Sequence, residues 1–460
     1  MKIAVIGTGY VGLTTGACLA ALEHNVTCFD TDSAKISGLN QGRLPIFEPG
    51  LAEIVETNQS IGRLAFVDEI SPALRDAELV FIAVGTPSGR EGDVDLRFVE
   101  QAARDAAPHL AAESVLVIKS TVPAGTAAHV RDLISTATGR KKISVASNPE
   151  FLREGSAIED FFEPDRIVIG TDDNTAAARL QELYAPFLKR GVPTVMATTV
   201  DAELIKYAAN AFLALKIGFI NQVADLCERT QADIVPVARG IGLDRRIGSA
   251  FLAPGPGYGG SCFPKDTRAF AATGRRHGAP QTLVETLVKV NEARKVELAE
   301  RICAAFGGRL AGRRITVLGT AFKANTDDMR EAAALTIVPI LQRRGALIRA
   351  HDPQGRRSGE TLLPDVEWID DPYSAAGGAD AVVILTEWRQ YASLNCRRLA
   401  QGMNGRLLID YRNLLAPDEV VRAGLTYVSL GRAASPAPYR SSGRRNSAGA
   451  DWRDIAASPL

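Results

Sequence analysis

The chain has 460 residues, of which 46% are hydrophobic and 23% are charged, as in an average soluble globular protein. Its 53 Lys and Arg residues equal its 53 Asp and Glu residues, so the composition offers no basic excess for binding nucleic acid. The six cysteines form no CxxC pair and have no histidine at ligand spacing, which argues against a zinc site and against a disulfide scaffold. We therefore expect neither a metal nor a nucleic-acid partner.

The sequence shows no secretory leader, and it contains no apolar run of about 18 residues that could span a bilayer. These features predict a cytoplasmic protein without a membrane partner. The length predicts two or three domains, since domains usually have about 100 to 200 residues.

The first predicted elements are an apolar strand at residues 2–6, the segment GTGYVG at 7–12, a helix at 13–22 and a strand at 25–29. Further buried strands are predicted at 79–84, 115–118, 143–146 and 167–169. Nearly continuous apolar strands that alternate with helices are typical of a parallel sheet covered on both faces.

The GTGYVG segment joins a strand to a helix, the context in which GxGxxG binds a dinucleotide. Gly7 permits the tight turn, Gly9 lets a pyrophosphate approach the backbone, and Gly12 lets helix and strand pack closely. Asp30, at the end of the next strand, can bind ribose hydroxyls and repel a 2′-phosphate, which favours NAD over NADP. The alternative is a helix-start turn in an unrelated α/β fold. Gly85 and Thr86 follow a later strand, at the sheet edge where such folds bind ligands.

A long helix is predicted at 201–229 and another at 281–306, followed by strands at 314–318, 347–351, 381–385 and 407–409. The predicted fold class is therefore α/β, with two Rossmann-like doubly wound parallel-sheet domains joined by a long central helix. The predicted domains are 1–200 for NAD, 201–306 for a central helical segment with the cysteine loop, and 307–432 for a second Rossmann-like domain, to which the family resemblance given below assigns UDP. Residues 433–460 are rich in Ser, Arg, Pro and Ala and are predicted to be a disordered tail.

The segment GPGYGGSCFPKD at 255–266 combines five glycines, a thiol, a lysine and a carboxylate, which is not core composition. A neighbouring cation favours the thiolate form of a cysteine, so Cys262 is a candidate nucleophile. The alternative for a single cysteine is a small buried hydrophobic side chain. Lys206 and Asn210 are four residues apart on the long predicted helix, hence on one face, where the alternative for Lys206 is a solvated surface.

Several long motifs in the chain resemble those of the UDP-glucose and GDP-mannose dehydrogenase family, over residues 1 to about 431. They are GTGYVG, VGTP (84–87), KSTVPAGT (119–126), SNPEFLREGSAI (147–158), ELIKYAANAF (203–212), RIG (246–248), GPGYGGSCFPKD and AFKANTDDMRE (321–331). The resemblance implies two successive hydride transfers to two NAD molecules, with no release of the aldehyde.

In the chemistry that this resemblance implies, the Cys262 thiolate adds to the aldehyde at C6, and a second oxidation yields a thioester that water hydrolyses. Lys206 would stabilise the alkoxide or take its proton, while Asn210 would hold the oxygen. Glu150, Thr121 and Asp266 would position water and act as general base, although Glu150 could instead only cap a helix.

The resemblance also assigns binding residues. For the cofactor they are Gly7, Gly9, Tyr10, Val11, Gly12, Asp30, Lys35, Gly85, Thr86, Thr121, Glu154, Lys265 and Arg330. For the substrate they are Glu150, Phe151, Leu152, Lys206, Asn210, Arg246, Tyr258, Gly259, Lys323 and Arg412. Arg246 resembles a residue that reaches a neighbouring subunit, which implies a homodimer.

The loops around 151–155 and 251–258 resemble the UDP-glucose branch of the family, so UDP-glucose is the expected substrate. The same chemistry on GDP-mannose or on a UDP-N-acetylhexosamine is the alternative. A non-catalytic nucleotide-binding protein is a further alternative, against which stands the joint presence of the six catalytic candidates. The chain departs from the family pattern at Thr8 and around Arg412, so base recognition is less well defined than catalysis.

Overall fold

The computed structural model describes residues 1–89, 92–140 and 143–432. The tail predicted at 433–460 lies outside these residues. The described chain forms two compact units, of which the first contains residues 1–211 and 265–281, and the second contains 212–264 and the residues from 282 onward.

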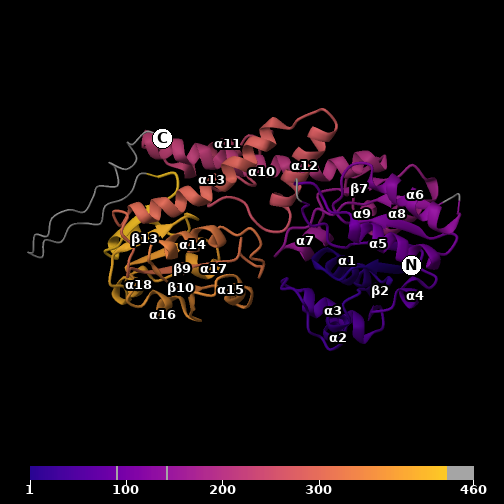
Figure 1. Ribbon diagram of the computed structural model, residues 1–460, viewed down its shortest axis with the longest axis horizontal. Helices are drawn as coiled ribbons and strands as arrows, with labels where there is room; N and C mark the ends of the chain where they lie inside the picture. The colour runs from indigo at the N-terminus through magenta and orange to yellow at the C-terminus, as the bar shows by residue number, and fades with distance from the viewer. Residues whose placement is uncertain (90–91, 141–142, 433–460) are drawn as a thin grey trace, which may run out of the picture. The chain divides into compact units, whose positions relative to one another are not determined.

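The first unit is built on an eight-stranded sheet in the order β3-β2-β1-β4-β5-β6-β7-β8 (Figure 1). Its strands are β1 (Lys2–Ile6), β2 (Asn25–Phe29), β3 (Leu64–Val67), β4 (Leu79–Ile82), β5 (Val115–Ile118), β6 (Ser144–Ser147), β7 (Ile167–Gly170) and β8 (Thr194–Ala197). The short strands β3 and β8 were not predicted from the sequence. Both are four-residue strands at the edges of the sheet, where Leu64 and Phe66 of β3 are buried and no residue of β8 is buried.

Helices cover both faces of this sheet because successive strand residues point to opposite sides. Ile3 and Val5 pack into one core, and Ala4 and Ile6 pack into the other. The first core is closed by α1 (Tyr10–Ala21), α2 (Ser33–Asn40), α3 (Leu51–Ser60), α7 (Ala157–Phe162), α8 (Asn174–Leu183) and α9 (Ala185–Lys189). The second core is closed by α4 (Ile70–Leu74), α5 (Arg97–Ala106), the 3-10 turn Ala107–His109 and α6 (Thr126–Thr138).

The sheet is parallel except at β7, which pairs antiparallel with β6 through Ser147 and Gly170. The sequence analysis expected parallel strands throughout. After β6 the chain does not cross to the far edge of the sheet. Residues 148–166 stay at the edge where β6 ends, and β7 enters the sheet from that edge. Both ends of this segment are therefore fixed at the edge where parallel sheets bind ligands.

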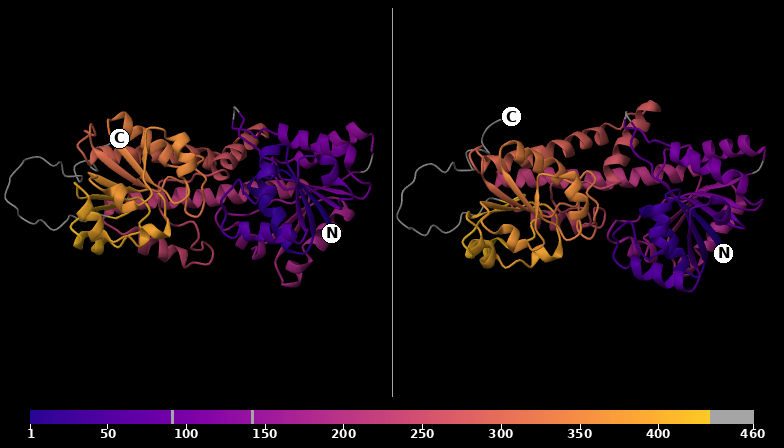
Figure 2. Two further views of the ribbon diagram at one scale, coloured as in Figure 1. Left: turned by 90° about the horizontal axis from the view of Figure 1, so that it is seen from below. Right: turned by 60° about the horizontal axis from the view of Figure 1, so that its bottom comes forward.

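The second unit has a six-stranded parallel sheet in the order β11-β10-β9-β12-β13-β14. Its strands are β9 (Arg314–Leu318), β10 (Leu347–His351), β11 (Glu367–Trp368), β12 (Ala381–Ile384), β13 (Leu407–Asp410) and β14 (Thr426–Ser429). Helices pack on both faces, as the views in Figure 2 show. They are α14 (Ala334–Arg343), α15 (Arg356–Leu362), α16 (Pro372–Ala376), α17 (Arg389–Ala392), α18 (Cys396–Gly402) and α19 (Pro417–Arg422).

The two sheets repeat one local design. Gly7 follows β1 and donates its N–H to the carbonyl of Phe29 at 2.8 Å, and Gly319 follows β9 and donates to His351 in the same way. An aspartate follows the neighbouring strand in each unit. In the second unit, Asp352 is buried and accepts the backbone N–H groups of four residues. These are Thr320, Ala321, Gln354 and Gly355.

Helices α10 (Thr199–Thr230), α11 (Ile234–Gly242) and α12 (Phe263–Arg276) contribute no residue to the cores of the two sheets, whereas α13 (Thr282–Ala304) packs its last turns into a core of the second sheet. The 32-residue helix α10 joins the two units, which confirms the predicted fold class of two α/β domains connected by a long central helix. Among the described residues, no helix is long and apolar enough to cross a membrane.

Candidate active site

The first part of the site is the turn between β1 and α1. Gly7 has a φ of +101°, and a side chain on Gly12 would lie 1.9 Å from the Gly7 carbonyl oxygen. Both positions therefore require glycine. Gly9 precedes the first residue of α1, and no atom lies within 4 Å of the place where its Cβ would be. The open side of this turn can admit a pyrophosphate to the N-terminus of α1.

Asp30 follows β2 and faces this turn. One of its carboxylate oxygens accepts hydrogen bonds of 2.8 Å from the Thr8 N–H and hydroxyl, and it forms a 2.9 Å ion pair with Lys35. Burial raises the pKa of Asp30, but the hydrogen bonds from Lys35 and Thr8 outweigh this effect and hold the pKa below its ordinary value. Asp30 therefore carries a negative charge, which is the property that the predicted role of binding ribose hydroxyls and repelling a 2′-phosphate requires.

Two further cofactor candidates follow β4, where Gly85 is exposed and Thr86 is buried. The Ser120 hydroxyl, after β5, donates to the Val84 carbonyl at 2.7 Å, so the ends of these two strands are tied together. Thr121, the next residue, is partly buried at the same edge.

The catalytic candidates of the first unit form two buried pairs. Lys206 Nζ lies 3.1 Å from Glu150 Oε1, and both side chains are about 4% exposed. Asn210 Nδ2 donates to Asp266 Oδ2 at 2.6 Å, while Lys265 Nζ donates to the other carboxylate oxygen at 2.5 Å. Lys206 and Asn210 share one face of α10, as their spacing predicts. The structure thus brings together two carboxylates, two ammonium groups and an amide.

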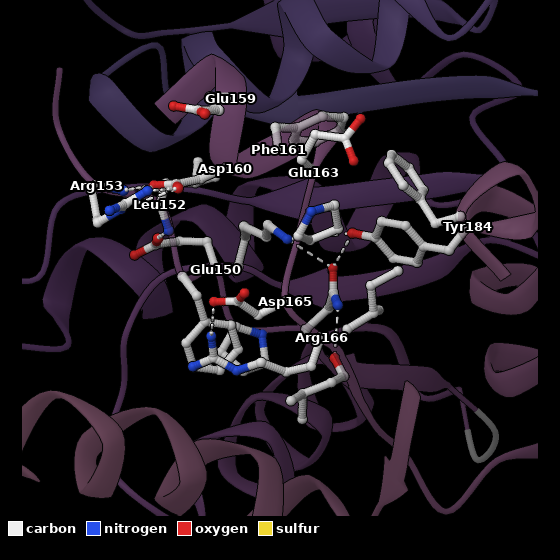
Figure 3. A pocket seen from close by; sticks show the side chains of 18 residues that line it. Glu150, Leu152, Arg153, Glu159, Asp160, Phe161, Glu163, Asp165, Arg166 and Tyr184 are labelled. Atoms are coloured by element: carbon white, nitrogen blue, oxygen red, sulfur yellow. Dashed lines mark hydrogen bonds and ion pairs between the residues drawn. The ribbon is translucent and has the colours of Figure 1, made fainter. Parts of the chain in front are cut away.

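A cavity of about 160 Å³ lies behind Glu150, between the segment after β6 and the strand β7 (Figure 3). The Phe151 ring on its wall is contacted by two cations. The Arg166 guanidinium lies 3.6 Å from the ring centroid and Lys206 Nζ lies 5.2 Å from it. Such cation–π contacts fix the ring and, with it, the backbone next to Glu150.

Lys119 is a buried cation of this cavity that the sequence analysis did not assign a role. Its Nζ donates to Asn148 Oδ1 at 2.9 Å, and the Tyr184 hydroxyl donates to the same oxygen at 2.6 Å. Burial lowers the pKa of Lys119 to about 8. Because Asn148 stands two residues before Glu150, this network fixes the start of the segment that carries Glu150.

The cysteine loop belongs to the second unit and is held by two helices. Asn291 of α13 accepts the Tyr258 N–H at 2.8 Å and donates to the Tyr258 carbonyl at 3.1 Å. Arg294 donates to the Gly255 carbonyl at 2.8 Å, and Asn221 of α10 accepts the Gly255 N–H. The loop is therefore fixed through its backbone.

Cys262 ends this loop and directly precedes α12, whose first turn carries Asp266. Its sulfur lies 3.4 Å from the Ser261 hydroxyl. Cys262 is partly exposed, whereas the other five cysteines are buried. Burial raises the pKa of those five thiols, which keeps them protonated. The partly exposed thiol at the positive end of a helix is the one suited to act as a nucleophile.

The remaining substrate candidates also lie in the second unit. Arg412 donates to the carbonyls of Leu385 and Phe322 at 2.7 and 3.0 Å, and its Nη1 lies 3.0 Å from the Cβ that Gly255 would carry. Gly259 is packed against the Glu331 carbonyl, and Lys323 lies beside the Phe322 ring. Arg412 thus lies next to the cysteine loop, of which Gly259 is a part.

Two arginine candidates are exposed and pair with a neighbouring aspartate. Arg330 forms a 2.8 Å ion pair with Asp328, and Arg246 forms a 2.6 Å ion pair with Asp244. Arg330 belongs to the second unit, whereas the glycine-rich turn belongs to the first.

Three family models match the chain. Residues 1–188 match the NAD binding domain, residues 200–293 the central domain and residues 316–417 the UDP binding domain of the UDP-glucose/GDP-mannose dehydrogenase family. The chain belongs to the UDP-glucose/GDP-mannose dehydrogenase family. The predicted family resemblance and the predicted cofactor NAD are confirmed.

Relatives of this dehydrogenase family cover nearly the whole chain. The UDP-glucose 6-dehydrogenase of Rhizobium meliloti is 50% identical, over 94% of this chain and 100% of its own length. UDP-glucose 6-dehydrogenase TuaD of Bacillus subtilis is 45% identical, over 94% of each chain. A solved UDP-glucose dehydrogenase from Pyrobaculum islandicum is 39% identical, with a TM-score of 0.85, over 94% of this chain and 98% of that one. The chain is a dehydrogenase that acts on a nucleotide sugar.

Glu203 begins the ELIKYAANAF motif, but the sequence analysis assigned no role to this buried carboxylate, which lies one turn before Lys206 on α10. It accepts the N–H groups of Gly125 and Ala127 at 2.6 and 2.8 Å. Burial raises its pKa from 4.5 to about 7, although these hydrogen bonds lower it. Glu203 therefore fixes the start of α6, close in sequence to Thr121.

We predict that Glu203 makes the stability of the protein depend on pH. Because the pKa of Glu203 is higher in the folded protein, the folded state binds this proton more tightly than the unfolded chain. The resulting contribution is present at low pH and is lost as the pH rises from about 4.5 through about 7, a change of about 3 kcal/mol. The free energy of unfolding in urea is measured for wild type and Glu203→Gln at pH 5 and at pH 8. The difference in favour of wild type should be smaller at pH 8 than at pH 5. The exposed Glu113→Gln is the control, and an advantage that does not change with pH would contradict the prediction.

Proposed function

We propose that the chain oxidises the primary alcohol of UDP-glucose to the carboxylate of UDP-glucuronate. The observation that carries the proposal is the pair of buried contacts, Lys206 with Glu150 and Asn210 with Asp266, together with Cys262 at the start of the helix that holds Asp266. The named relatives that act on UDP-glucose support this substrate.

NAD, when bound, would supply the hydride acceptor in each of the two oxidation steps. In the first step, C6 loses a hydride to this acceptor and its hydroxyl loses a proton to water, while the Lys206 ammonium stabilises the negative charge on the oxygen. The Cys262 thiolate then forms a bond to the aldehyde carbon, and the oxygen takes a proton to give a thiohemiacetal.

In the second step, the thiohemiacetal carbon loses a hydride and its hydroxyl loses a proton, which leaves a thioester on Cys262. Water attacks this carbon, the C–S bond breaks, and the sulfur leaves as thiolate. Glu150 takes the proton from the attacking water, and Thr121 and Asp266 orient it. The lasting bond to Cys262 is what prevents escape of the aldehyde.

The proposal extends to the binding residues named from the family resemblance. In the first unit, Asp30 and Lys35 bind the adenosine ribose at the GTGYVG turn. In the second unit, Lys323 binds the diphosphate, because an ammonium group suits phosphate oxygens. Arg412 lies near the uracil, because a planar guanidinium can stack on a planar ring.

The substrate is tested by NADH formation with UDP-glucose, GDP-mannose and UDP-N-acetylglucosamine offered separately. We expect UDP-glucose to give the highest kcat/KM and two NADH for each sugar nucleotide consumed. One NADH per sugar with release of an aldehyde would exclude the thioester. A higher kcat/KM for GDP-mannose or UDP-N-acetylglucosamine would change the substrate assignment but not the proposed reaction chemistry.

We also propose a homodimer. Phe212, Phe219 and Leu226 recur every seven residues on one face of α10, and they are 64%, 56% and 59% exposed. A row of large exposed apolar side chains is typical of an interface, and a second copy of the same helix offers a matching row. Light scattering should give twice the chain mass of 49.1 kDa, and a mass of one chain would exclude the dimer.

The proposed compartment is the cytoplasm. The six cysteines, all within the described part of the chain, form no disulfide, and the proposed mechanism requires the Cys262 thiol in reduced form.

A further inference from the structure

A buried carboxylate with no assigned role, Glu48, connects two loops of the first unit. It lies in the segment before α3 and is 5% exposed. Its Oε2 accepts the Gly155 N–H at 2.6 Å and its Oε1 accepts the Ala157 N–H at 2.7 Å. The Tyr10 hydroxyl donates to the same Oε2. Glu48 thus has partners on both loops.

One of these loops is the glycine-rich turn that binds NAD. Tyr10 is the first residue of α1, directly after Gly9. Burial, and next the hydrogen bond to Glu48, raise the pKa of the Tyr10 hydroxyl far above its ordinary value. Tyr10 therefore stays protonated and donates to Glu48 at all working pH values.

The other loop is the segment 148–157, which carries the catalytic candidate Glu150. Gly155 has a φ of +78°, and its N–H also lies 3.1 Å from the Tyr10 hydroxyl. Arg153 pairs with Asp160 of α7 at 2.5 Å, so the end of this loop moves with α7. A shift of Gly155 therefore reaches Glu150 through a short and constrained piece of backbone.

Packing around Glu48 makes this connection rigid. Val11 of α1, Leu51 of α3 and Ile158 of α7 belong to one apolar core. A carboxylate buried beside that core has few alternative partners, because unpaired charge in an apolar setting is costly. The three donors are consequently held at fixed positions relative to one another.

We propose that Glu48 is a positioning residue that couples binding of the dinucleotide at the GTGYVG turn to placement of the loop that carries Glu150. This inference rests on the proposed function, because it assigns the sugar nucleotide to the 148–157 loop. When the pyrophosphate docks at the start of α1, Tyr10 is fixed. Glu48 transmits this constraint to the Gly155 and Ala157 N–H groups, and the loop is ordered for the sugar. By reciprocity, the bound sugar nucleotide tightens binding of the dinucleotide.

The coupling is measured with NADH and UDP-glucose, a pair that cannot react. The affinity for NADH is read from nicotinamide fluorescence, without and with saturating UDP-glucose. In wild type we expect UDP-glucose to tighten NADH binding about fivefold or more. In Glu48→Gln the side-chain NH2 group faces a backbone N–H group, which also donates. We expect the ratio of the NADH affinities with and without UDP-glucose to fall within about twofold of one. In the same variant kcat should fall about 10- to 100-fold because Glu150 is misplaced.

Two further variants keep the proposal falsifiable. Tyr10→Phe removes only the hydroxyl and leaves Glu48 on Gly155 and Ala157, so it should reduce the coupling ratio even if Glu48→Gln fails to fold. The exposed Glu56→Gln on α3 should keep the wild-type ratio. A wild-type ratio near one, or a ratio unchanged in folded Glu48→Gln or in Tyr10→Phe, overturns the proposal.

Failure of the proposed function gives a different result. If another sugar nucleotide supports NADH formation, the same titration is made with that compound, and the Glu48 comparison stands. If UDP-glucose is turned over but the ratio does not depend on Glu48, the function stands and the coupling role is rejected.

Discussion

We expect Cys262→Ser to abolish net oxidation of UDP-glucose while leaving binding of the sugar nucleotide close to that of wild type. A serine hydroxyl at this position is a far weaker nucleophile than a thiolate, so the aldehyde is not captured and no thioester forms. Steady-state NADH formation should fall by about 10³-fold or more. Isothermal titration with UDP-glucose should give a dissociation constant within about threefold of wild type, since one sulfur contributes little to binding.

Alkylation provides the control for this prediction. Iodoacetamide should label one cysteine in the folded wild type, because Cys262 is partly exposed and the other five are buried. Cys262→Ser should take up none under the same conditions. Unchanged turnover in this variant, or labelling of a different cysteine in step with loss of activity, would reject the nucleophile.

The second large effect is expected for Lys206→Met. This change removes the ammonium group that faces the developing charge on the C6 oxygen and also leaves the Glu150 carboxylate buried without its partner. We expect kcat to fall by about 10²- to 10³-fold, as when one oxyanion donor is removed, with a smaller change in KM.

The matched control for Lys206→Met is Lys189→Met at the end of α9, where the side chain is exposed. It should retain wild-type kcat. A further check separates charge from structure: Lys206→Arg keeps a cation beside Glu150, and its thermal stability should lie nearer to wild type than that of Lys206→Met. A kcat for Lys206→Met within threefold of wild type would contradict the assignment.

Much of the fold was predictable because buried parallel strands are short apolar runs with sharp ends. The strands at 2–6, 25–29 and 115–118 were located to the residue. The reversed direction of β7 was not, because an apolar run carries no information on the direction in which a strand enters a sheet. The strands β11 and β14 were also missed, since β11 has only two residues and β14 is the partly polar segment TYVS, which forms no apolar run.

The candidate site divides along the same line. Lys206 and Asn210 could be paired from helical spacing, which is local. The contacts of Lys119 with Asn148 and Tyr184, and those of Glu48 with Tyr10 and Gly155, join residues up to 107 positions apart. Such pairings depend on the order of strands in the sheet, so the sequence alone offered no signal for them.

The hydrogen bonds of Asp352 bear on how many nicotinamide nucleotides the chain can bind at one time. Asp352 accepts the backbone N–H groups of four residues of its own unit, whereas Asp30 accepts those of two, Thr8 and Asp32, so Asp352 has less capacity left to bind a ribose. In the proposed reaction, each chain then holds one nicotinamide nucleotide at a time. Between the two oxidations, NADH has to dissociate and a second NAD has to bind, while the sugar nucleotide stays covalently bound to Cys262. Turnover in this scheme can be no faster than that exchange.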